Sequence, residues 1–262
     1  MTTLRLLFAS LFLAVTLLAQ NITDASRGVG DAIASIGTAT PKWFAWKVPI
    51  GKHSICCNRC SLDGNNGFSI NDGDDDDDGP ITRGEMLLAV RVEGGKVKKV
   101  RLFDANCKID TRGKTLHMLA NVTVESSVDY LLAQMRNADR EGELLAALAL
   151  HEHPRVVPAL IQLARHDPDK EVRRHAIFWL GQQAGAKAAA ELRRAIDEDP
   201  DADVRQHAVF AISQLPAERS VPLLIELVKT HKSREVREKA MFWLAQTGDP
   251  RGLDLIEGIL LK

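Results

Sequence analysis

The sequence has no excess of positive charge and, beyond residue 20, no long apolar run. It contains 34 basic and 35 acidic side chains, which gives a formal net charge of -1. Proteins that bind nucleic acid normally carry a basic excess, so this balance argues against that class of partner. A helix that spans a membrane needs about 20 consecutive, mostly apolar residues, and no such stretch follows residue 20. We therefore expect no nucleic-acid partner and no membrane span in the mature chain.

The sequence also lacks the spacings that most catalytic and metal sites require. Its N-terminal half has no nucleophile–base pair and no phosphate-binding glycine loop, and its cysteines have no matching Cys/His pair at zinc-finger spacing. The His151-Glu152 pair occurs once, and on a helix His153 would point away from His151. We therefore expect no catalytic residue, no metal ligand and no enzymatic activity.

The N-terminal segment 1–20, MTTLRLLFASLFLAVTLLAQ, differs from the rest of the chain. Arg5 supplies a positive charge, residues 6–18 form a weakly polar to apolar run, and the small residue Ala19 follows. This order is typical of a secretory signal, and the run is short for a membrane span. We predict that residues 1–19 are a signal peptide and that the mature protein is periplasmic or extracellular. An uncleaved anchor is the alternative.

Export would place the four cysteines in an oxidising compartment, where cysteines pair. Cys56, Cys57, Cys60 and Cys107 allow three connectivities, and the one that joins the neighbours Cys56 and Cys57 is strained. Two connectivities remain open: Cys57–Cys60 with Cys56–Cys107, or Cys56–Cys60 with Cys57–Cys107. A redox C-x-x-C motif would precede a helix, whereas the loop-like SLDGNNGFS follows Cys60. We predict structural disulfides.

Residues 26–125 are predicted to form a β-rich domain tied by these disulfides. EMLLAVRVEGGKVKKVRLF places two strands around Gly94-Gly95, a dipeptide that suits the positive φ angles of a tight hairpin turn. LHMLANVTV is a third candidate strand. Trp43 and Trp46 are interpreted as core or rim aromatics, with ligand stacking as the alternative. The fold class is α+β, because the sequence that follows is helical.

An aspartate run in this domain matches a calcium-binding pattern. Asp74, Asp76, Asp78, Gly79 and Glu85 fit D-x-D-x-D-G-x5-E, the loop of an EF-hand. However, the preceding DGNNGFSINDG cannot form the entering helix, and a run of five aspartates matches the pattern by accident. We interpret the segment as a solvated acidic loop without a cofactor, and calcium binding is the alternative.

From Ser127 onward the apolar period is helical, and Ser127 is predicted to cap the first helix. VRRHAIFWL, VRQHAVFAI and VREKAMFWL follow at equal intervals, beginning at positions 172, 204 and 236. A second helix follows each copy, and a divergent first copy at 140–150 brings the count to four helix pairs within 127–262. One pair cannot bury its own apolar face, so each copy is expected to pack against the next.

This period and pattern resemble the short bacterial form of HEAT repeats, the kind also seen in phycobilisome-lyase-like proteins. The resemblance covers residues 140–262 and rests on DPDKEVRRHAIFWL, DPDADVRQHAVFAI and HKSREVREKAMFWL. The W-x-x-L-G and T-P-L-H signatures of other repeat families of similar length are absent. The resemblance implies an α-solenoid of four helix pairs that binds another protein. By analogy of fold alone it also admits lyase or metal-dependent hydroxylase activity, which no residue pattern here supports.

Two surfaces of this solenoid are candidates for partner binding. Phe178, Phe210 and Phe242 lie away from the apolar stripe and either pack between repeats or form an exposed strip; we favour packing. The partner surface is then assigned to polar positions of the second helices, whose mixed charges suit a protein. These positions are Gln162, Arg165, Glu191, Arg194, Glu226 and Lys229. The sequence thus predicts an exported, non-catalytic interaction module or scaffold. An enzyme or calcium-regulated adaptor with its site in the N-terminal domain is the alternative.

Overall fold

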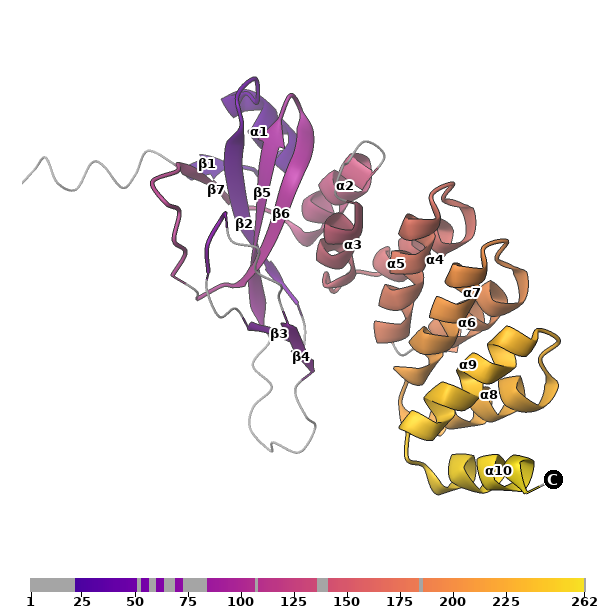
Figure 1. The fold of residues 1–262 in the computed structure, drawn as a ribbon. Coiled ribbons are helices and arrows are strands. Elements are labelled where there is room, and N and C mark those ends of the chain that lie inside the picture. Colours follow the sequence, from indigo (N-terminus) through magenta and orange to yellow (C-terminus); the bar gives the residue numbers. More distant parts are fainter. Residues whose placement is uncertain are drawn as a thin grey trace, which may run out of the picture. The chain divides into compact units, whose positions relative to one another are not determined.

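The computed structural model describes residues 22–50, 53–56, 60–63, 69–72, 84–106, 108–135, 141–183 and 186–261 (Figure 1). The predicted signal peptide, Cys57, Cys107 and the aspartates of the candidate calcium loop lie outside these residues, as does the side chain of Cys56. Export, the disulfides and calcium binding therefore stay predictions. The chain forms two compact units, 1–152 and 153–262. In the part of the chain that the structure describes, no helix is long and apolar enough to cross a membrane.

The first unit contains a five-stranded mixed sheet with the strand order β1-β7-β2-β5-β6. Its strands are β1 (Ile22–Asp24), β2 (Lys42–Pro49), β5 (Glu85–Glu93), β6 (Lys96–Asp104) and β7 (Leu116–Ala120). The strands β2, β5 and β6 pair antiparallel, whereas β7 runs parallel to both β1 and β2. A separate ribbon joins β3 (His53–Cys56) to β4 (Ser69–Asp72). The predicted β-rich N-terminal region is confirmed as a mixed sheet.

The hairpin between β5 and β6 follows the prediction from its two glycines. Gly94 and Gly95 have φ angles of 55° and 77°, which a residue with a side chain rarely adopts. The turn pairs Glu93 with Lys96, and the register of the two strands shifts between Arg91 and Val92. Every second residue of β5 faces the same side of the sheet.

Both faces of the sheet are buried. One face carries Phe44 and Trp46 and is covered by the helices α1 (Val29–Ile36), α2 (Val124–Met135) and α3 (Glu141–Ala149). On the other face, a cluster of Trp43, Ala45, Leu62, Leu87, Ala89 and Phe103 is joined by the partly buried Cys60 and Ile109. Trp43 and Trp46 are 3% and 0% exposed, which confirms that both are core aromatics.

Ser127 does not cap a helix, and that prediction is wrong. The helix α2 begins at Val124, and Thr123 Oγ1 accepts a hydrogen bond from Ser126 N at 3.1 Å. Ser127 is instead fully buried in the first turns, where its hydroxyl accepts a hydrogen bond from Trp46 Nε1 at 2.8 Å. The helix begins about one turn earlier than the apolar pattern of the sequence indicates. Ser127 therefore lies inside the helix, where it joins α2 to the sheet.

The second unit stacks helices at the predicted spacing. The first helices of the repeats are α5 (Lys170–Gln182), α7 (Ala202–Ser213) and α9 (Arg234–Gln246). The second helices are α4 (Val156–His166), α6 (Ala186–Glu198), α8 (Ala217–Thr230) and α10 (Pro250–Leu260). In Figure 1 the first helices lie side by side as one row, and α5 contacts α7, which contacts α9. The division between the units falls between α3 and α4, the two helices of the first predicted pair.

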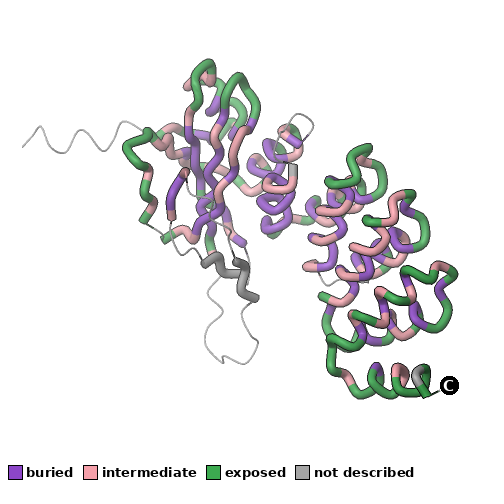
Figure 2. The backbone as a smooth tube through the Cα atoms, viewed as in Figure 1, coloured by how far each residue is buried: buried purple, intermediate pink, exposed green. Residues whose placement is uncertain are grey.

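The buried positions of this unit repeat with the sequence. Ala176, Ala208 and Ala240 are all 0% exposed, and their small side chains allow the helices of neighbouring repeats to approach closely. Leu160, Leu192 and Leu224 are buried at the corresponding place in the second helices. Figure 2 shows the buried segments on the facing sides of these helices. The predicted packing of each copy against the next is confirmed for α5, α7 and α9, whereas α3, the predicted divergent first copy, contacts α2 and β6 instead.

Candidate protein-binding surface

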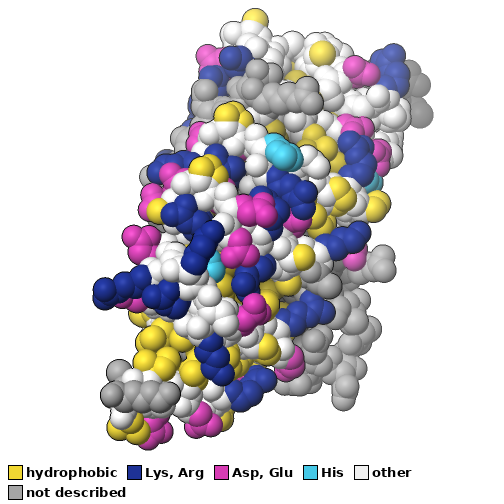
Figure 3. Space-filling view, turned by 90° about the vertical axis from the view of Figure 1, so that its right-hand side faces the viewer, with side chains coloured by type: hydrophobic (Ala, Val, Ile, Leu, Met, Phe, Trp, Pro, Cys, Tyr) yellow, Lys and Arg dark blue, Asp and Glu magenta, His cyan; other side chains and the backbone are white. Residues whose placement is uncertain are grey.

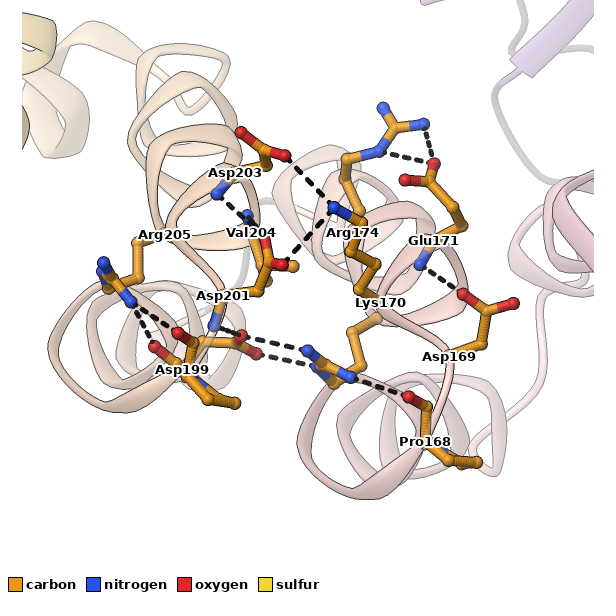
Figure 4. A network of polar contacts seen from close by, with 12 residues as sticks. Pro168, Asp169, Lys170, Glu171, Arg174, Asp199, Asp201, Asp203, Val204 and Arg205 are labelled. Atoms are coloured by element: carbon orange, nitrogen blue, oxygen red, sulfur yellow. Dashed lines mark hydrogen bonds and ion pairs between the residues drawn. The ribbon is translucent and has the colours of Figure 1, made fainter.

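Each first helix of the second unit begins at a capped turn. Asp169 accepts a hydrogen bond from Glu171 N at 2.8 Å, and Asp201 accepts one from Asp203 N at 2.9 Å (Figure 4). Ser233 takes the same place in the third copy and accepts from Val236 N at 3.5 Å. These side chains satisfy backbone donors that have no partner within the helix. The acidic turn of the repeat is therefore a structural cap.

The arginine that follows the valine of each repeat binds the turn before its own helix. Arg173 Nη1 donates to the carbonyl oxygen of Asp167 at 3.0 Å. Arg205 donates to Asp199 O at 2.8 Å, and Arg237 donates to His231 O at 2.7 Å. The same bond in three copies explains why V-R recurs: the guanidinium satisfies carbonyl groups that the end of the preceding helix leaves free.

Arg173 also forms a buried ion pair that Arg205, its counterpart in the next repeat, does not reproduce. Its Nε lies 2.9 Å from Asp199 Oδ2, and the two side chains are 10% and 3% exposed. The hydrogen bond that Arg173 donates to Asp199 raises the pKa of Arg173, because the carboxylate favours the charged guanidinium. At the position equivalent to Asp199 the next repeat has His231, which lies 3.2 Å from Asp197 instead. The repeats therefore share a bond to the turn and differ in their buried charges.

Three of the six positions predicted for partner binding contact one another. Arg165 Nε donates to Glu191 Oε2 at 2.8 Å, and Arg194 Nε donates to the same oxygen at 3.0 Å. Glu191 is buried, and the hydrogen bond from Arg165 lowers the pKa of its carboxyl group. These charges join α4 to α6, so they are engaged inside the protein before any partner arrives.

The other three positions lie at the surface. Gln162, Glu226 and Lys229 are exposed, and Glu226 Oε1 accepts a hydrogen bond from Arg193 Nη1 at 2.9 Å. Figure 3 shows basic and acidic side chains interspersed over one face of the molecule. Such mixed charge is suited to a protein partner, and the binding role of the six positions stays a prediction.

A row of aromatic rings crosses the first helices, and we call its four members the aromatic strip: Phe178, Phe210, Phe242 and Trp243. Phe178 and Phe210 stack with their ring centroids 6.3 Å apart, and Phe210 lies 4.9 Å from Trp243. These contacts join α5 to α7 and α7 to α9. The predicted packing between repeats is confirmed for Phe178 and Phe210, both of which are half-buried.

Phe242 departs from that prediction. Its side chain is 51% exposed, and its ring contacts Trp243 on the same helix at 4.9 Å, with Lys239 Nζ 5.8 Å from the ring centroid. Among the described residues, the rings of Phe178 and Phe210 contact rings on a neighbouring helix, whereas the ring of Phe242 contacts a ring only on its own helix. The expected strip did not include Trp243, although its signal was present: FW occurs at the same place in VRRHAIFWL and VREKAMFWL.

His207 lies against the strip, and its pKa and that of the neighbouring His175 are both lowered. Burial, followed by the charges of Arg174 and His175, lowers the pKa of His207 to about 4. Burial likewise lowers the pKa of His175. His207 lies 5.4 Å from the ring of Phe210, so the histidine extends the flat ring surface without adding charge. The strip is therefore apolar under ordinary conditions.

His151 has a structural role. Its Nδ1 lies 2.7 Å from Ala147 O and its Nε2 lies 2.8 Å from Ser127 Oγ, so both ring nitrogens are engaged. Trp46, Ser127 and His151 form a buried chain of hydrogen bonds that connects the sheet to α2 and to the end of α3. Within the described ranges no group of three His, Cys, Asp or Glu side chains is placed to hold a metal ion.

Comparison with known proteins identifies the repeated region. The family model for HEAT repeats matches residues 128–213, 157–242 and 191–262. Among solved structures, the complex of CpcE and CpcF of phycocyanin lyase from Nostoc sp. PCC7120 is similar, with 23% sequence identity and a TM-score of 0.35. The match covers 46% of this chain and 85% of that chain. No curated protein matches this sequence.

Proposed function

Because this chain belongs to the HEAT-repeat family, we propose that it is a non-catalytic module that binds another protein through its stacked helices. Repeats of this kind bury a continuous core and leave long surfaces on either side of the stack, which suits recognition of a protein. The sequence of the N-terminal segment 1–20 supports the further proposal that the module is exported and acts in the periplasm or outside the cell.

The exposure of Phe242 carries the proposal. A half-exposed phenylalanine beside Trp243, at the end of an apolar strip, is a surface that loses contact with water when a partner covers it. Aromatic residues of this kind supply much of the binding energy in protein interfaces. The ion pairs of Arg165, Glu191 and Arg194 make those second-helix positions less available. We therefore propose the aromatic strip as the main contact and the exposed Gln162 and Lys229 as the alternative surface.

Photo-crosslinking from single positions in the full chain tests this choice. A photoreactive residue at Phe242 is expected to capture one protein of defined mass, and the same residue at Lys229 serves as the matched position on a second helix. Capture from Lys229 and not from Phe242 would move the interface to the second helices. The absence of any captured protein at both positions would contradict the binding function.

Cell fractionation and N-terminal sequencing test the proposed export separately. The mature protein is expected in the exported fraction, with its N-terminus near position 20. Recovery of a chain that still begins at Met1 would overturn this part of the proposal and leave the binding function to be judged by the crosslinks.

A further inference from the structure

A cavity of about 470 Å³ lies in the first unit, beside the beginnings of β2 and β7. Its walls come from residues 40–43, from Arg91 on β5, from residues 114–115 and from His117 on β7. This volume falls in the range of protein sites for small molecules, roughly 300–1,000 Å³. All the residues that line the cavity belong to the sheet unit, and none of them is a member of the aromatic strip.

Two residues that line this cavity each have a buried hydrogen-bond donor without an acceptor among the described residues. Trp43 and Arg91 stand directly opposite each other on β2 and β5, so their side chains share one face of the sheet. Trp43 is 3% exposed, and no described group accepts a hydrogen bond from its buried Nε1 or from the buried Nε of Arg91. Leaving such donors unsatisfied costs free energy, and native proteins rarely do so. Two neighbouring donors without an acceptor therefore point to a partner outside the described residues, and the cavity beside them has room for a ligand that supplies one.

The charges around the cavity are mostly positive. Lys42, Arg91 and Lys114 line it, and none of the residues that line it is acidic. The nearby carboxylate of Asp63 is bound by Lys114, and that bond, together with the charges of Lys99 and Arg112, lowers the pKa of Asp63. Two carboxylates, Asp63 and Asp110, thus lie among these cations and pair with Lys114 and Arg112. The surroundings favour a negatively charged occupant.

We propose that this cavity binds a small organic anion, a carboxylate or a phosphate monoester with an apolar body. Oxygens of the anion accept hydrogen bonds from Trp43 Nε1 and Arg91 Nε, the two donors that lack an acceptor within the described protein. A guanidinium binds such groups strongly, because its donors are charged and held in a plane. The indole of Trp43 and the ring of Pro41 supply apolar surface for the rest of the ligand.

Indole resonances in the NMR spectrum of the ¹⁵N-labelled mature chain test this proposal. The chain has four tryptophans, and Trp43→Phe assigns the resonance that belongs to the cavity. The probes are benzoate and phenyl phosphate, with benzyl alcohol as the uncharged analogue and inorganic phosphate as the anion without an apolar body. We expect saturable movement of the Trp43 indole with benzoate or phenyl phosphate, and weak or no movement with the other two.

Arg91→Gln removes the guanidinium charge from the cavity and is expected to weaken binding of the better probe by about tenfold or more. Lys96→Gln is the matched control, because it removes one positive charge from the exposed hairpin of the same sheet and should leave binding unchanged. The spectra also report whether each variant is folded. Absence of a shift with both organic anions would overturn the proposal, as would unchanged affinity in folded Arg91→Gln. If inorganic phosphate binds with the same affinity as the organic anions, the apolar walls do not contribute to binding, and this result also contradicts the proposal.

Discussion

The two units of this chain are held together by contacts that differ in the separation of their residues along the sequence. In the sheet unit, Trp46 bonds to Ser127, which lies 81 residues away in the sequence, and β1 pairs with β7 near the other end of the domain. In the helical unit, the bond from Arg173 to the preceding turn recurs at Arg205 and Arg237. Each of these contacts in the sheet unit therefore occurs once, whereas the bond from the arginine to the turn occurs in three repeats of the helical unit. This difference predicts how each unit responds to a single substitution.

The largest effect is expected where a repeat contains a charge pair that its copies lack. Arg173→Leu leaves Asp199 buried without its partner and should lower the free energy of unfolding by about 3–4 kcal/mol. Arg205→Leu removes only the bond to the turn and should cost about 1 kcal/mol. Urea unfolding of the two variants measures the difference. Equal losses would mean that the repeats are more uniform in energy than their charges indicate.

The hydroxyl of Ser127 gives the next largest effect, in the sheet unit. Ser127→Ala removes the group that bonds to both Trp46 and His151, and we expect a loss of about 2–3 kcal/mol. Ser126→Ala, one residue earlier and only partly buried, is the control. Hydrogen exchange followed by mass spectrometry should show faster exchange in β2 and β5 and unchanged exchange in α8 and α9. Faster exchange in both units would contradict the expected independence of the two units, because it would show that they unfold together.

The aromatic strip provides a smaller contrast within the helical unit. Phe210→Ala removes a half-buried ring that contacts Phe178 and Trp243, and we expect a loss of about 2 kcal/mol, below that of a fully buried phenylalanine. Phe242→Ala should change stability by less than about 0.5 kcal/mol, since its ring is exposed. Thermal unfolding of the two variants gives the comparison. A large loss from Phe242→Ala would indicate a packing role and weaken its assignment to partner binding.

The smallest effect is a dependence on pH. The pKa of His207 is lowered in the folded protein to about 4, from an ordinary value of 6.5. The unfolded chain therefore binds the proton more readily, so stability is complete above about pH 6.5 and falls as the pH decreases toward 4. We expect a loss of about 1 kcal/mol, because solvent screens the half-exposed ring. His207→Phe should flatten the profile of melting temperature against pH, whereas the exposed His166→Gln should not. If the profile of melting temperature against pH is unchanged in His207→Phe, a group other than His207 causes the pH dependence.

The helical unit could be predicted from the sequence because its period is short and repeated. Val172, Val204 and Val236 fixed the spacing of the helices, and each is buried as expected. The exposure of Phe242 could not be predicted in this way, because a periodic pattern treats every copy alike and does not indicate which ring lacks a neighbour. Ion pairing of Glu191 was missed for a related reason: it depends on Arg165, which belongs to the preceding second helix.

The sheet unit was predictable only where its signals are local. Gly94 and Gly95 specified the hairpin, because a two-residue turn depends on the residues within it. The parallel pairing of β7 with β1 and β2 carries no comparable signal, because the partners are joined by long connections. The cavity beside Trp43 and Arg91 was missed for the same reason: these residues meet only after β2 and β5 have paired.

The bond from each repeat's arginine to the preceding turn has a consequence for the engineering of longer or shorter arrays. Arg205 donates to Asp199 and Pro200, so the binding group and its acceptors sit on opposite sides of the N-cap residue Asp201. A cassette cut at that residue would separate them and depend on the junction to restore the bond. A cassette cut in the middle of a second helix keeps the turn, the N-cap residue and the arginine together. Modules exchanged between such proteins should therefore be joined within second helices, so that each module contains its own turn, N-cap residue and arginine.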